Sequence, residues 1–258
     1  MPKLCANISM LFNELPFLQR YQAAADHGFI GVECLFPYDF SVNQVVEALG
    51  KSGLPQVLIN TSAGDWDAGD RGMACDANRQ QEFQQSVKQA LAYASAMGNP
   101  LVHVMAGLLS RGESLEAAEN VYVQNLRWAA AQAQVLGLKL TMEAINPIDM
   151  PGYMLFNQGQ ALRLCKAVGA DNLGIQFDFF HCQKHEGNAL EQFEQLLPHI
   201  FHIQIAGVPE RHEPNTGDLD YRLVFDAIDA SDYTGYVGCE YRPKTTTLAG
   251  LDWLRLWS

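Results

Sequence analysis

The chain has 258 residues, of which 48% are hydrophobic and 18% charged, a composition typical of a globular protein. Its formal net charge is −12, from 17 Lys and Arg against 29 Asp and Glu, so its surface offers phosphate backbones no general attraction and nucleic acid is disfavoured as a partner. The first residues, MPKLCANISMLFNELPF, contain no long apolar run, and we expect neither a secretory signal nor a membrane span.

Short apolar runs rich in β-branched residues alternate with longer amphipathic stretches along the whole chain. We predict strands at residues 4–9, 31–36, 55–61, 101–107, 139–146, 173–181, 201–207 and 235–241. We predict helices at residues 16–27, 41–50, 79–98, 114–137, 157–169, 189–200, 220–231 and 249–257. Eight strands, each followed by a helix, indicate an α/β fold of the (β/α)8 TIM barrel type. An open, doubly wound sheet is the alternative, but no glycine-rich nucleotide-binding loop follows any of these strands.

The alternation continues from residue 1 to residue 258 without a linker or a change of composition, so we expect a single domain. The six cysteines are spread along the chain without a CxxC pair. This spacing is typical of reduced thiols that serve as small apolar residues, and not of a disulfide framework. We therefore expect a cytoplasmic protein.

Two long loops, residues 62–78 and 208–220, follow the third and the seventh predicted strands. Both leave the carboxyl ends of their strands, which is the face where barrels of this kind place their active sites. Their length and their content of Gly and Asp are typical either of lids over a site or of surface excursions without a function.

The fifth to the eighth predicted strands each carry a polar residue in an apolar run. Because side chains alternate along a strand, the last inward residues of these strands are Glu143, Asp178, Gln204 and Glu240. Carboxylates that share a small site repel one another, by roughly 4 kcal/mol for two unit charges about 4 Å apart at an effective dielectric near 20. A divalent cation removes this repulsion, and an all-oxygen set favours Mg²⁺ or Mn²⁺ over Zn²⁺. One such residue alone is more often a hydrogen-bonded structural group, but four in register predict a metal site.

The first four strands carry weaker signals of the same kind. Their polar residues are Asn7, Glu33, Asn60 and His103. Each is interpreted either as a hydrogen-bonded core residue or as a group that contacts a ligand, and we take Asn7 and His103 as candidates for substrate binding. His181, three residues after Asp178, is a further candidate to bind a substrate oxygen.

Seven stretches match a known family in order and over nearly the whole length. They are ANISMLF, GVECLFPYDF, NTSAGDWDAGDRG, HVMAG, QFDFFHCQ, HIQIAGVPERHEPNTGDLDY and GCEYRPKTTT. On these stretches the chain resembles the hydroxypyruvate isomerase family of the xylose isomerase-like TIM barrels. The resemblance implies an aldose–ketose isomerase of short acid sugars, with Glu143 and Glu240 as the acid–base pair and all four mouth residues as metal ligands. Gln204 stands where many relatives in the wider group carry His, which argues against tight zinc binding.

This family includes hydroxypyruvate isomerases and 2-oxo-tetronate isomerases, and the residues leave both activities open. The interconversion of hydroxypyruvate and tartronate semialdehyde moves a proton between neighbouring carbons through an enediolate, and we expect Glu143 and Glu240 to shuttle it. The substrate carboxylate needs a cation. Arg71 and Arg211 in the two long loops, and Arg242 after Glu240, are candidates, although each is otherwise a solvated surface arginine.

Three other functions remain open at this point. A ketose 3-epimerase uses the same two glutamates on a longer sugar, and a non-catalytic barrel binds a sugar acid as a sensor. A metal-dependent phosphodiesterase of the DNA-repair type is disfavoured by the net charge of −12. Near the C-terminus, Trp253, Leu254 and Trp257 are candidates either for a homo-oligomer interface or for a cap on the barrel.

Overall fold

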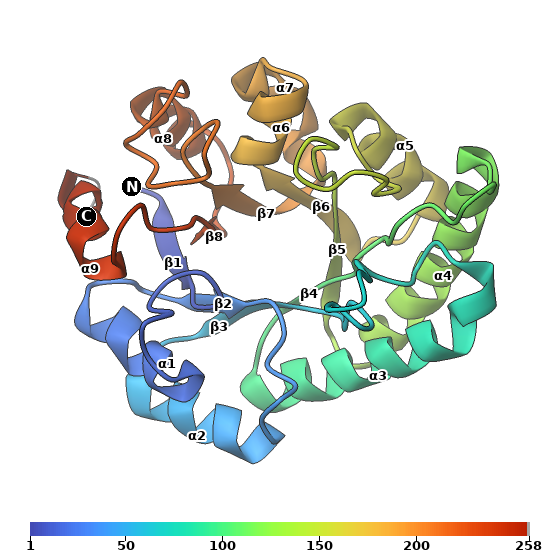
Figure 1. Ribbon diagram of the computed structural model, residues 1–258, viewed down its shortest axis with the longest axis horizontal. Helices are drawn as coiled ribbons and strands as arrows, with labels where there is room; N and C mark the ends of the chain where they lie inside the picture. Colours follow the sequence, from blue (N-terminus) through green and yellow to red (C-terminus); the bar gives the residue numbers. More distant parts are fainter. Residues whose placement is uncertain (257–258) are drawn as a thin grey trace.

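The computed structural model describes residues 1–256 and is a closed barrel of eight parallel strands with helices around it (Figure 1). The strands are β1 Lys3–Asn7, β2 Val32–Cys34, β3 Gln56–Asn60, β4 Leu101–His103, β5 Lys139–Glu143, β6 Leu173–Asp178, β7 Ile200–Ile205 and β8 Tyr236–Cys239. They follow one another around the barrel in chain order, and β8 closes it by pairing with β1. The predicted (β/α)8 fold is confirmed.

The α-helices of the described residues form the outer ring seen in Figure 1. They are α1 Phe17–Asp26, α2 Val42–Ser52, α3 Gln80–Met97, α4 Leu115–Val135, α5 Gln158–Val168, α6 Phe179–His185, α7 Ala189–Leu196, α8 Tyr221–Ala230 and α9 Thr247–Gly250. The longer helices bury apolar residues toward the barrel, as Phe83, Val87 and Leu91 do on α3. Within residues 1–256, we find no helix with the length and apolar character that a membrane crossing requires.

The prediction for the sixth strand, residues 173–181, is wrong at its carboxyl end. β6 ends at Asp178, whose Oδ1 accepts a hydrogen bond from the backbone N of Phe180 at 2.8 Å and thereby caps α6. Periodicity does not separate a short buried helix from a buried strand, and the run after Asp178 is apolar. As a result, His181 lies in the first turn of α6 and not on a strand.

Three of the predicted helices are divided between an α-helix and a 3-10 turn, and the strands predicted at 101–107 and 139–146 end early, at His103 and Glu143. The helix predicted at 79–98 begins with the 3-10 turn η1 Ala77–Arg79, and the helix predicted at 189–200 ends in η2 Leu197–His199. The C-terminal helix predicted at 249–257 is α9 followed by η3 Leu251–Leu256, and residue 257, with the candidate Trp257, lies outside the described residues. Trp253 and Leu254 are buried within the chain, which favours packing against the barrel over an exposed interface.

The register of the strands places the inward polar residues at one end of the barrel. Glu143 pairs with Gln176, Asp178 pairs with Gln204, and Gln204 pairs with Gly238. Their outward-facing neighbours belong to the apolar core between the barrel and the helices. The alternation of inward polar and outward apolar residues that the sequence predicts for these strands is therefore present.

The inner face of β8 lies very close to Glu33 of β2. A Cβ atom at Gly238 would lie 2.4 Å from Glu33 Oε2, inside van der Waals contact. We predict that Gly238→Ala lowers the free energy of unfolding by about 1–3 kcal/mol because the added methyl group overpacks the interior. Urea denaturation measures this change.

Gly50 of α2 provides the matched control, because a Cβ atom there meets nothing within 4 Å. Gly50→Ala should leave the free energy of unfolding unchanged or raise it by up to about 1 kcal/mol. Equal stability of Gly238→Ala and the unmodified protein would contradict the close approach of β8 to Glu33.

Candidate active site

A cavity of about 210 Å³ opens at the carboxyl ends of the strands. The predicted site residues that line it are Arg71, His103, Glu143, His181, Arg211, Glu240 and Arg242. These residues come from strands, from α6 and from both long loops, so the fold brings together segments that lie far apart in the sequence. Three other predicted residues, Asn7, Asp178 and Gln204, are buried and are not among the residues that line the cavity.

A larger depression, of about 640 Å³, lies at the opposite end of the barrel, where strands β4, β5, β7 and β8 begin. Of the described residues that line it, only Lys139 and Asp232 carry charge. The smaller cavity, by contrast, holds several buried titratable side chains, which is the usual mark of an active site. We therefore place the candidate active site at the carboxyl ends of the strands.

Two of the site carboxylates have an oxygen atom with no hydrogen-bond partner among the described residues. Glu143 Oε2 accepts a hydrogen bond from Gln176 Nε2 at 3.1 Å, while Glu143 Oε1 accepts none. Asp178 Oδ1 caps α6, while Asp178 Oδ2 accepts none. A buried polar atom without a partner is costly, so these two oxygens are available to a ligand.

Arg211 is the cation nearest to this acidic cluster. Its Nη2 lies 3.2 Å from Glu240 Oε2 and 3.6 Å from Asp178 Oδ2, and its side chain is only 15% exposed. The backbone of Arg211 has a positive φ of 60°, and its carbonyl accepts a hydrogen bond from the backbone N of Arg242 at 2.7 Å. The loop after β7 is thereby held against the end of β8.

Burial raises the pKa of all three site carboxyls. For Glu143 the carboxylates of Glu240 and Asp178 add to the effect of burial, and its pKa lies well above the ordinary value. Burial raises the pKa of Glu240 to about 8 and that of Asp178 to about 6, although Arg211 opposes both shifts. Without a bound cation, the cluster therefore retains protons at neutral pH.

The hydrogen bonds of His181 fix which ring nitrogen carries the proton. Its Nδ1 faces Asn146 Nδ2 at 2.6 Å and the backbone N of Asn146 at 3.4 Å, and both of these are donors. Burial lowers the pKa of His181 well below its ordinary value, so the ring is neutral and Nε2 carries the hydrogen. Nε2 lies 3.8 Å from Glu143 Oε1 and 3.7 Å from Asp178 Oδ2. His181 thus suits donation to an oxygen in the cavity better than coordination of a metal.

His103 on β4 also faces the cavity. Its Nδ1 lies 3.7 Å from Glu143 Oε2, and neither ring nitrogen has a hydrogen-bond partner among the described residues. Burial lowers the pKa of His103 to about 3, so the ring is neutral at physiological pH. It is able to donate one hydrogen bond to a ligand and to accept another.

The side chains of Asn7 and Gln204 are turned toward Glu33 inside the barrel. Glu33 Oε1 accepts hydrogen bonds from Asn7 Nδ2 at 3.0 Å and from Gln204 Nε2 at 2.8 Å. The Gln204 carbonyl faces Gln176 Nε2 at 2.7 Å and keeps a second lone pair. Asn7 is therefore a neighbour of the hydrogen-bond network below the cavity rather than of the cavity itself.

Arg71 lies at the edge of the cavity in the loop after β3. Its guanidinium stacks on Trp66 at 3.7 Å from the ring centre, and its Nη1 donates to the backbone carbonyls of Trp66 and Asp70. These contacts hold the side chain in place, since stacking and two hydrogen bonds fix a planar guanidinium. Arg71 is thus a preorganised cation at the entrance.

Two contributors to the site are missing from the sequence predictions. Asn146 sets the tautomer of His181, and Asp149 lines the cavity and pairs with Lys184 at 2.7 Å. The signal that points to Asn146 is its position before Pro147 at the end of a strand, because Asn before Pro favours a turn with side-chain hydrogen bonds. Asn146 Oδ1 indeed accepts from the backbone N of Ile148 and of Asp149.

The donor set fits a hard divalent cation. One carboxylate oxygen of Glu143, one of Asp178 and one ring nitrogen of His181 lie within 4.8 Å of one another. Gln204 pairs with Asp178 in the register of β6 and β7, and Arg211 contacts both Asp178 and Glu240, so these residues bring further oxygen atoms to the same end of the barrel. Oxygen ligands with two or more negative charges are those that Mg²⁺ and Mn²⁺ prefer. A cation would also remove the repulsion that raises the pKa of Glu143.

Comparison with known proteins agrees with this architecture. A family model described as xylose isomerase-like TIM barrel matches residues 21–257. The chain is 45% identical to a 2-oxo-tetronate isomerase from Cupriavidus necator, over 99% of this chain and 98% of that protein. It is 44% identical to a hydroxypyruvate isomerase from Escherichia coli, over 98% of each protein.

Solved structures show the same fold. A protein from Brucella melitensis described as an AP endonuclease of family 2 is 41% identical, with a TM-score of 0.97 over 100% of this chain and 99% of that chain. A D-psicose 3-epimerase from Clostridium cellulolyticum is 15% identical, with a TM-score of 0.78 over 99% of this chain and 90% of that chain. The second likeness concerns the fold alone.

The raised pKa of Glu240 predicts how stability depends on pH when no metal is bound. Between the ordinary value of 4.5 and about 8, the folded protein holds a proton that the unfolded chain has released. The folded state then binds more protons, so the free energy of unfolding falls as the pH rises through this window. Urea denaturation in EDTA at pH 5 and at pH 8 measures the fall, and Glu240→Gln, which cannot ionise, should reduce it. An equal fall in both proteins would contradict the raised pKa.

Proposed function

Because the chain belongs to the xylose isomerase-like TIM barrel family and is an isomerase, we propose that it interconverts hydroxypyruvate and tartronate semialdehyde. The observation that carries the proposal is the pair Glu143 and Glu240, two buried glutamates with raised pKa values that line one small cavity beside arginine side chains. The similarity to the hydroxypyruvate isomerase from Escherichia coli supports this choice of substrate.

A 2-oxo-tetronate is the second candidate substrate. It is supported by the similarity to the isomerase from Cupriavidus necator, at nearly the same identity. This acid sugar has one more carbon than hydroxypyruvate but presents the same carboxylate, ketone and neighbouring hydroxyl group to the site. The proton transfer that the two glutamates would perform is therefore the same for both substrates.

In the proposed reaction, one glutamate removes a proton from the hydroxymethyl carbon, and the resulting enediolate receives a proton at the neighbouring carbon from the other. The hydroxyl proton passes from one oxygen to the other, so no atom or electron is gained or lost. Glu143 and Glu240 suit this exchange because both are buried carboxyl groups that line the same small cavity, so each is able to hold or release a proton beside the substrate. The neutral rings of His103 and His181 would donate to the substrate oxygens.

We assign a divalent cation, Mg²⁺ or Mn²⁺, to this site. Glu143, Asp178, Gln204 and Glu240 would hold it, in agreement with their oxygen chemistry and with the two unpartnered carboxylate oxygens. When bound, it supplies Lewis acid stabilisation of negative charge on the substrate oxygens. The role of Arg211 is then to hold Glu240 and Asp178, since its guanidinium contacts both.

The substrate carboxylate is assigned to Arg71. Arg211 already contacts two carboxylates, whereas Arg71 contacts only backbone carbonyls and an indole ring among the interactions of its guanidinium. A guanidinium binds a carboxylate through two parallel hydrogen bonds, and a preorganised one loses little side-chain entropy. Arg242, which also lines the cavity, is the alternative cation.

The other classes of function are less consistent with the chain. A phosphodiester substrate would meet a protein of net charge −12 and a cavity of about 210 Å³ beside three buried carboxylates. Repulsion of a polyanion from such a site disfavours a nuclease. The isomerase names of the relatives favour an enzyme over a non-catalytic sugar-acid sensor.

We predict that Glu143→Gln and Glu240→Gln each lower kcat by about 10²- to 10⁴-fold, because an amide cannot exchange the proton. Proton NMR of the purified protein with hydroxypyruvate in D₂O would follow the appearance of tartronate semialdehyde. Circular dichroism would confirm that both variants are folded. Near-full turnover by Glu240→Gln would rule out the assignment.

The same assay tests the cation and the substrate. Removal of divalent metal with EDTA should abolish turnover, and added Mg²⁺ or Mn²⁺ should restore it. If turnover persists in EDTA, the reaction does not require a divalent cation, and the proposed role of the two glutamates still stands. Turnover of 2-oxo-tetronate alone would select the second candidate substrate.

We predict that Arg71→Gln raises KM by about 10- to 100-fold and leaves kcat within a few-fold, because it removes charged hydrogen bonds worth about 1.5–3 kcal/mol to the bound carboxylate. Steady-state kinetics measures both parameters. Arg163→Gln is the control, since Arg163 pairs with Glu119 on the outer helices. If the KM of Arg71→Gln equals that of the control, Arg71 does not bind the substrate carboxylate, and another cation must do so.

A further inference from the structure

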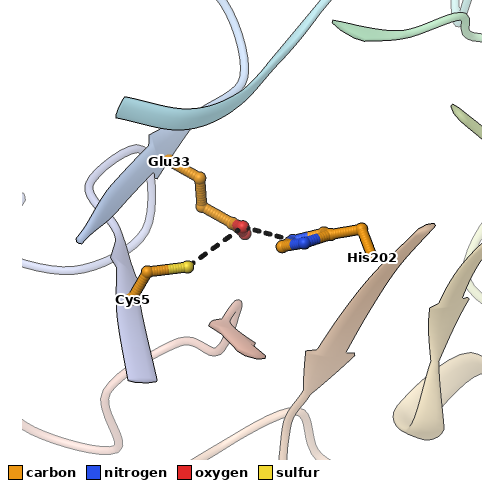
Figure 2. A group of neighbouring side chains, drawn as sticks. All are labelled: Cys5, Glu33 and His202. Carbon is orange, nitrogen blue, oxygen red and sulfur yellow. Dashed lines mark hydrogen bonds and ion pairs between the residues drawn. The ribbon is translucent and has the colours of Figure 1, made fainter. Parts of the chain in front are cut away.

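Glu33 is a buried carboxylate inside the barrel that faces donors on every side. Its Oε2 accepts from His202 Nε2 at 2.6 Å and lies 3.6 Å from Cys5 Sγ. Figure 2 shows the side chains of Cys5 and His202 pointing toward Glu33 from different strands. Its Oε1 accepts from Gln204 Nε2 at 2.8 Å and from Asn7 Nδ2 at 3.0 Å. The residue lines no part of the cavity, so it does not touch a bound substrate there.

The group formed by Cys5, Glu33 and His202 has the residue types of a metal site but not the spacing of one. The 2.6 Å between His202 Nε2 and Glu33 Oε2 is a hydrogen-bond distance. Two ligands of one zinc ion, each about 2.1 Å from it in tetrahedral geometry, stand roughly 3.4 Å apart. The role of Glu33 must therefore be sought in its hydrogen bonds.

These hydrogen bonds have a direction. The side-chain amide of glutamine has its NH₂ donor on one side of the terminal carbon and its oxygen acceptor on the other. A carboxylate neighbour can only accept, so the NH₂ group turns toward it and the oxygen turns away. Because Glu33 takes the NH₂ group of Gln204, the Gln204 carbonyl faces the other way and meets Gln176 Nε2 at 2.7 Å. The second hydrogen of Gln176 Nε2 goes to Glu143 Oε2 at 3.1 Å. Gln176 Oε1 is left to accept from Thr141 Oγ1 at 3.1 Å.

We propose that Glu33 is a positioning residue that acts through Gln204 and Gln176 on Glu143, and we call this chain of four residues the amide relay. The relay presents the Gln204 carbonyl as an oxygen donor and occupies Glu143 Oε2, which leaves Glu143 Oε1 as the unpartnered oxygen beside the cavity. The inference rests on the proposed roles of Glu143 and Gln204 in the isomerase site. A reversal of the Gln204 amide would place two acceptors face to face at Glu33 and two donors face to face at Gln176. A reversal of the Gln176 amide would place two acceptors face to face at Glu143.

Glu33→Met tests the relay, because methionine has a similar length and replaces the two carboxylate oxygens with a sulfur atom that accepts only weakly from Gln204 Nε2. In the metal-free protein, nuclear Overhauser contacts of the Gln176 NH₂ protons report their orientation. In the unmodified protein these protons should contact the Glu143 side chain, and in Glu33→Met they should gain contact with the Thr141 methyl group. The hydrogen bonds of the Gln176 side chain go to Thr141, Glu143 and Gln204 and not to residue 33, so a change in its orientation measures transmission through the relay.

Glu119→Met is the matched control. Glu119 is also a buried glutamate that accepts from a glutamine, Gln160 Nε2 at 2.8 Å, but it lies on α4 outside the barrel. Its loss should lower stability without turning Gln176. Unchanged orientation of the Gln176 amide in Glu33→Met would overturn the proposal.

Function supplies the second readout. Calorimetric titration should show that Glu33→Met binds Mn²⁺ at least about tenfold more weakly than the unmodified protein, because loss of a hydrogen-bond partner of a metal ligand typically weakens metal binding by this factor. The affinity of Glu119→Met for Mn²⁺ should be unchanged. If Glu33→Met does not fold, Gln176→Leu interrupts the relay instead and should weaken Mn²⁺ binding and lower kcat. If Gln176→Leu has the same affinity for Mn²⁺ and the same kcat as the unmodified protein, the proposal is overturned.

The two proposals fail in different ways. Unmodified protein that binds no Mn²⁺ and converts no acid sugar would contradict the proposed function. The amide orientations are read without metal or substrate, so they decide the relay in that case as well.

Discussion

Burial of carboxylates inside the barrel is the constraint to which most of this structure responds. An ionised carboxylate in apolar surroundings costs several kcal/mol unless donors or opposite charge compensate it. Glu33 is compensated by Asn7, His202 and Gln204, and the pKa of its carboxyl is lowered by these partners despite the opposing effect of burial. Glu143, by contrast, keeps an oxygen without a hydrogen-bond partner, and its pKa is raised. The carboxylate of Glu33 therefore has its hydrogen-bond partners within the protein, whereas the carboxylate of Glu143, nearer the cavity, is available to a ligand.

The same residues serve the fold and the site. Asp178 caps α6 with one oxygen and offers the other to the cluster, so the end of a strand, the start of a helix and a candidate ligand coincide. The helix it caps carries His181, whose proton is placed on Nε2 by the turn at Asn146. Such coupling is typical of barrels in which the segments after the strands carry the chemistry while the strands supply rigidity.

The long loops contribute cations to a site built mostly of acids. Arg211 reaches the buried carboxylates from the loop after β7, and Arg71 is held at the entrance by Trp66 in the loop after β3. Their environments differ, because the first contacts two carboxylates and the second contacts backbone carbonyls and an indole ring. This difference separates a cation that holds the acidic groups from one that remains available to an anionic substrate, a distinction that residue type alone does not make.

The sequence by itself determined the barrel and its polar mouth, because strand alternation and helix periodicity are local properties of the chain. Alternation identified the inward positions of Glu143, Asp178, Gln204 and Glu240 without knowledge of the fold. Only the tertiary structure decided that Asn7 and the Gln204 amide turn toward Glu33, and that Asn146 sets the tautomer of His181. These outcomes depend on partners 26, 171 and 35 residues away, respectively. Hydrogen bonds between strands and loops so distant in sequence are set by barrel closure, and no local pattern records them.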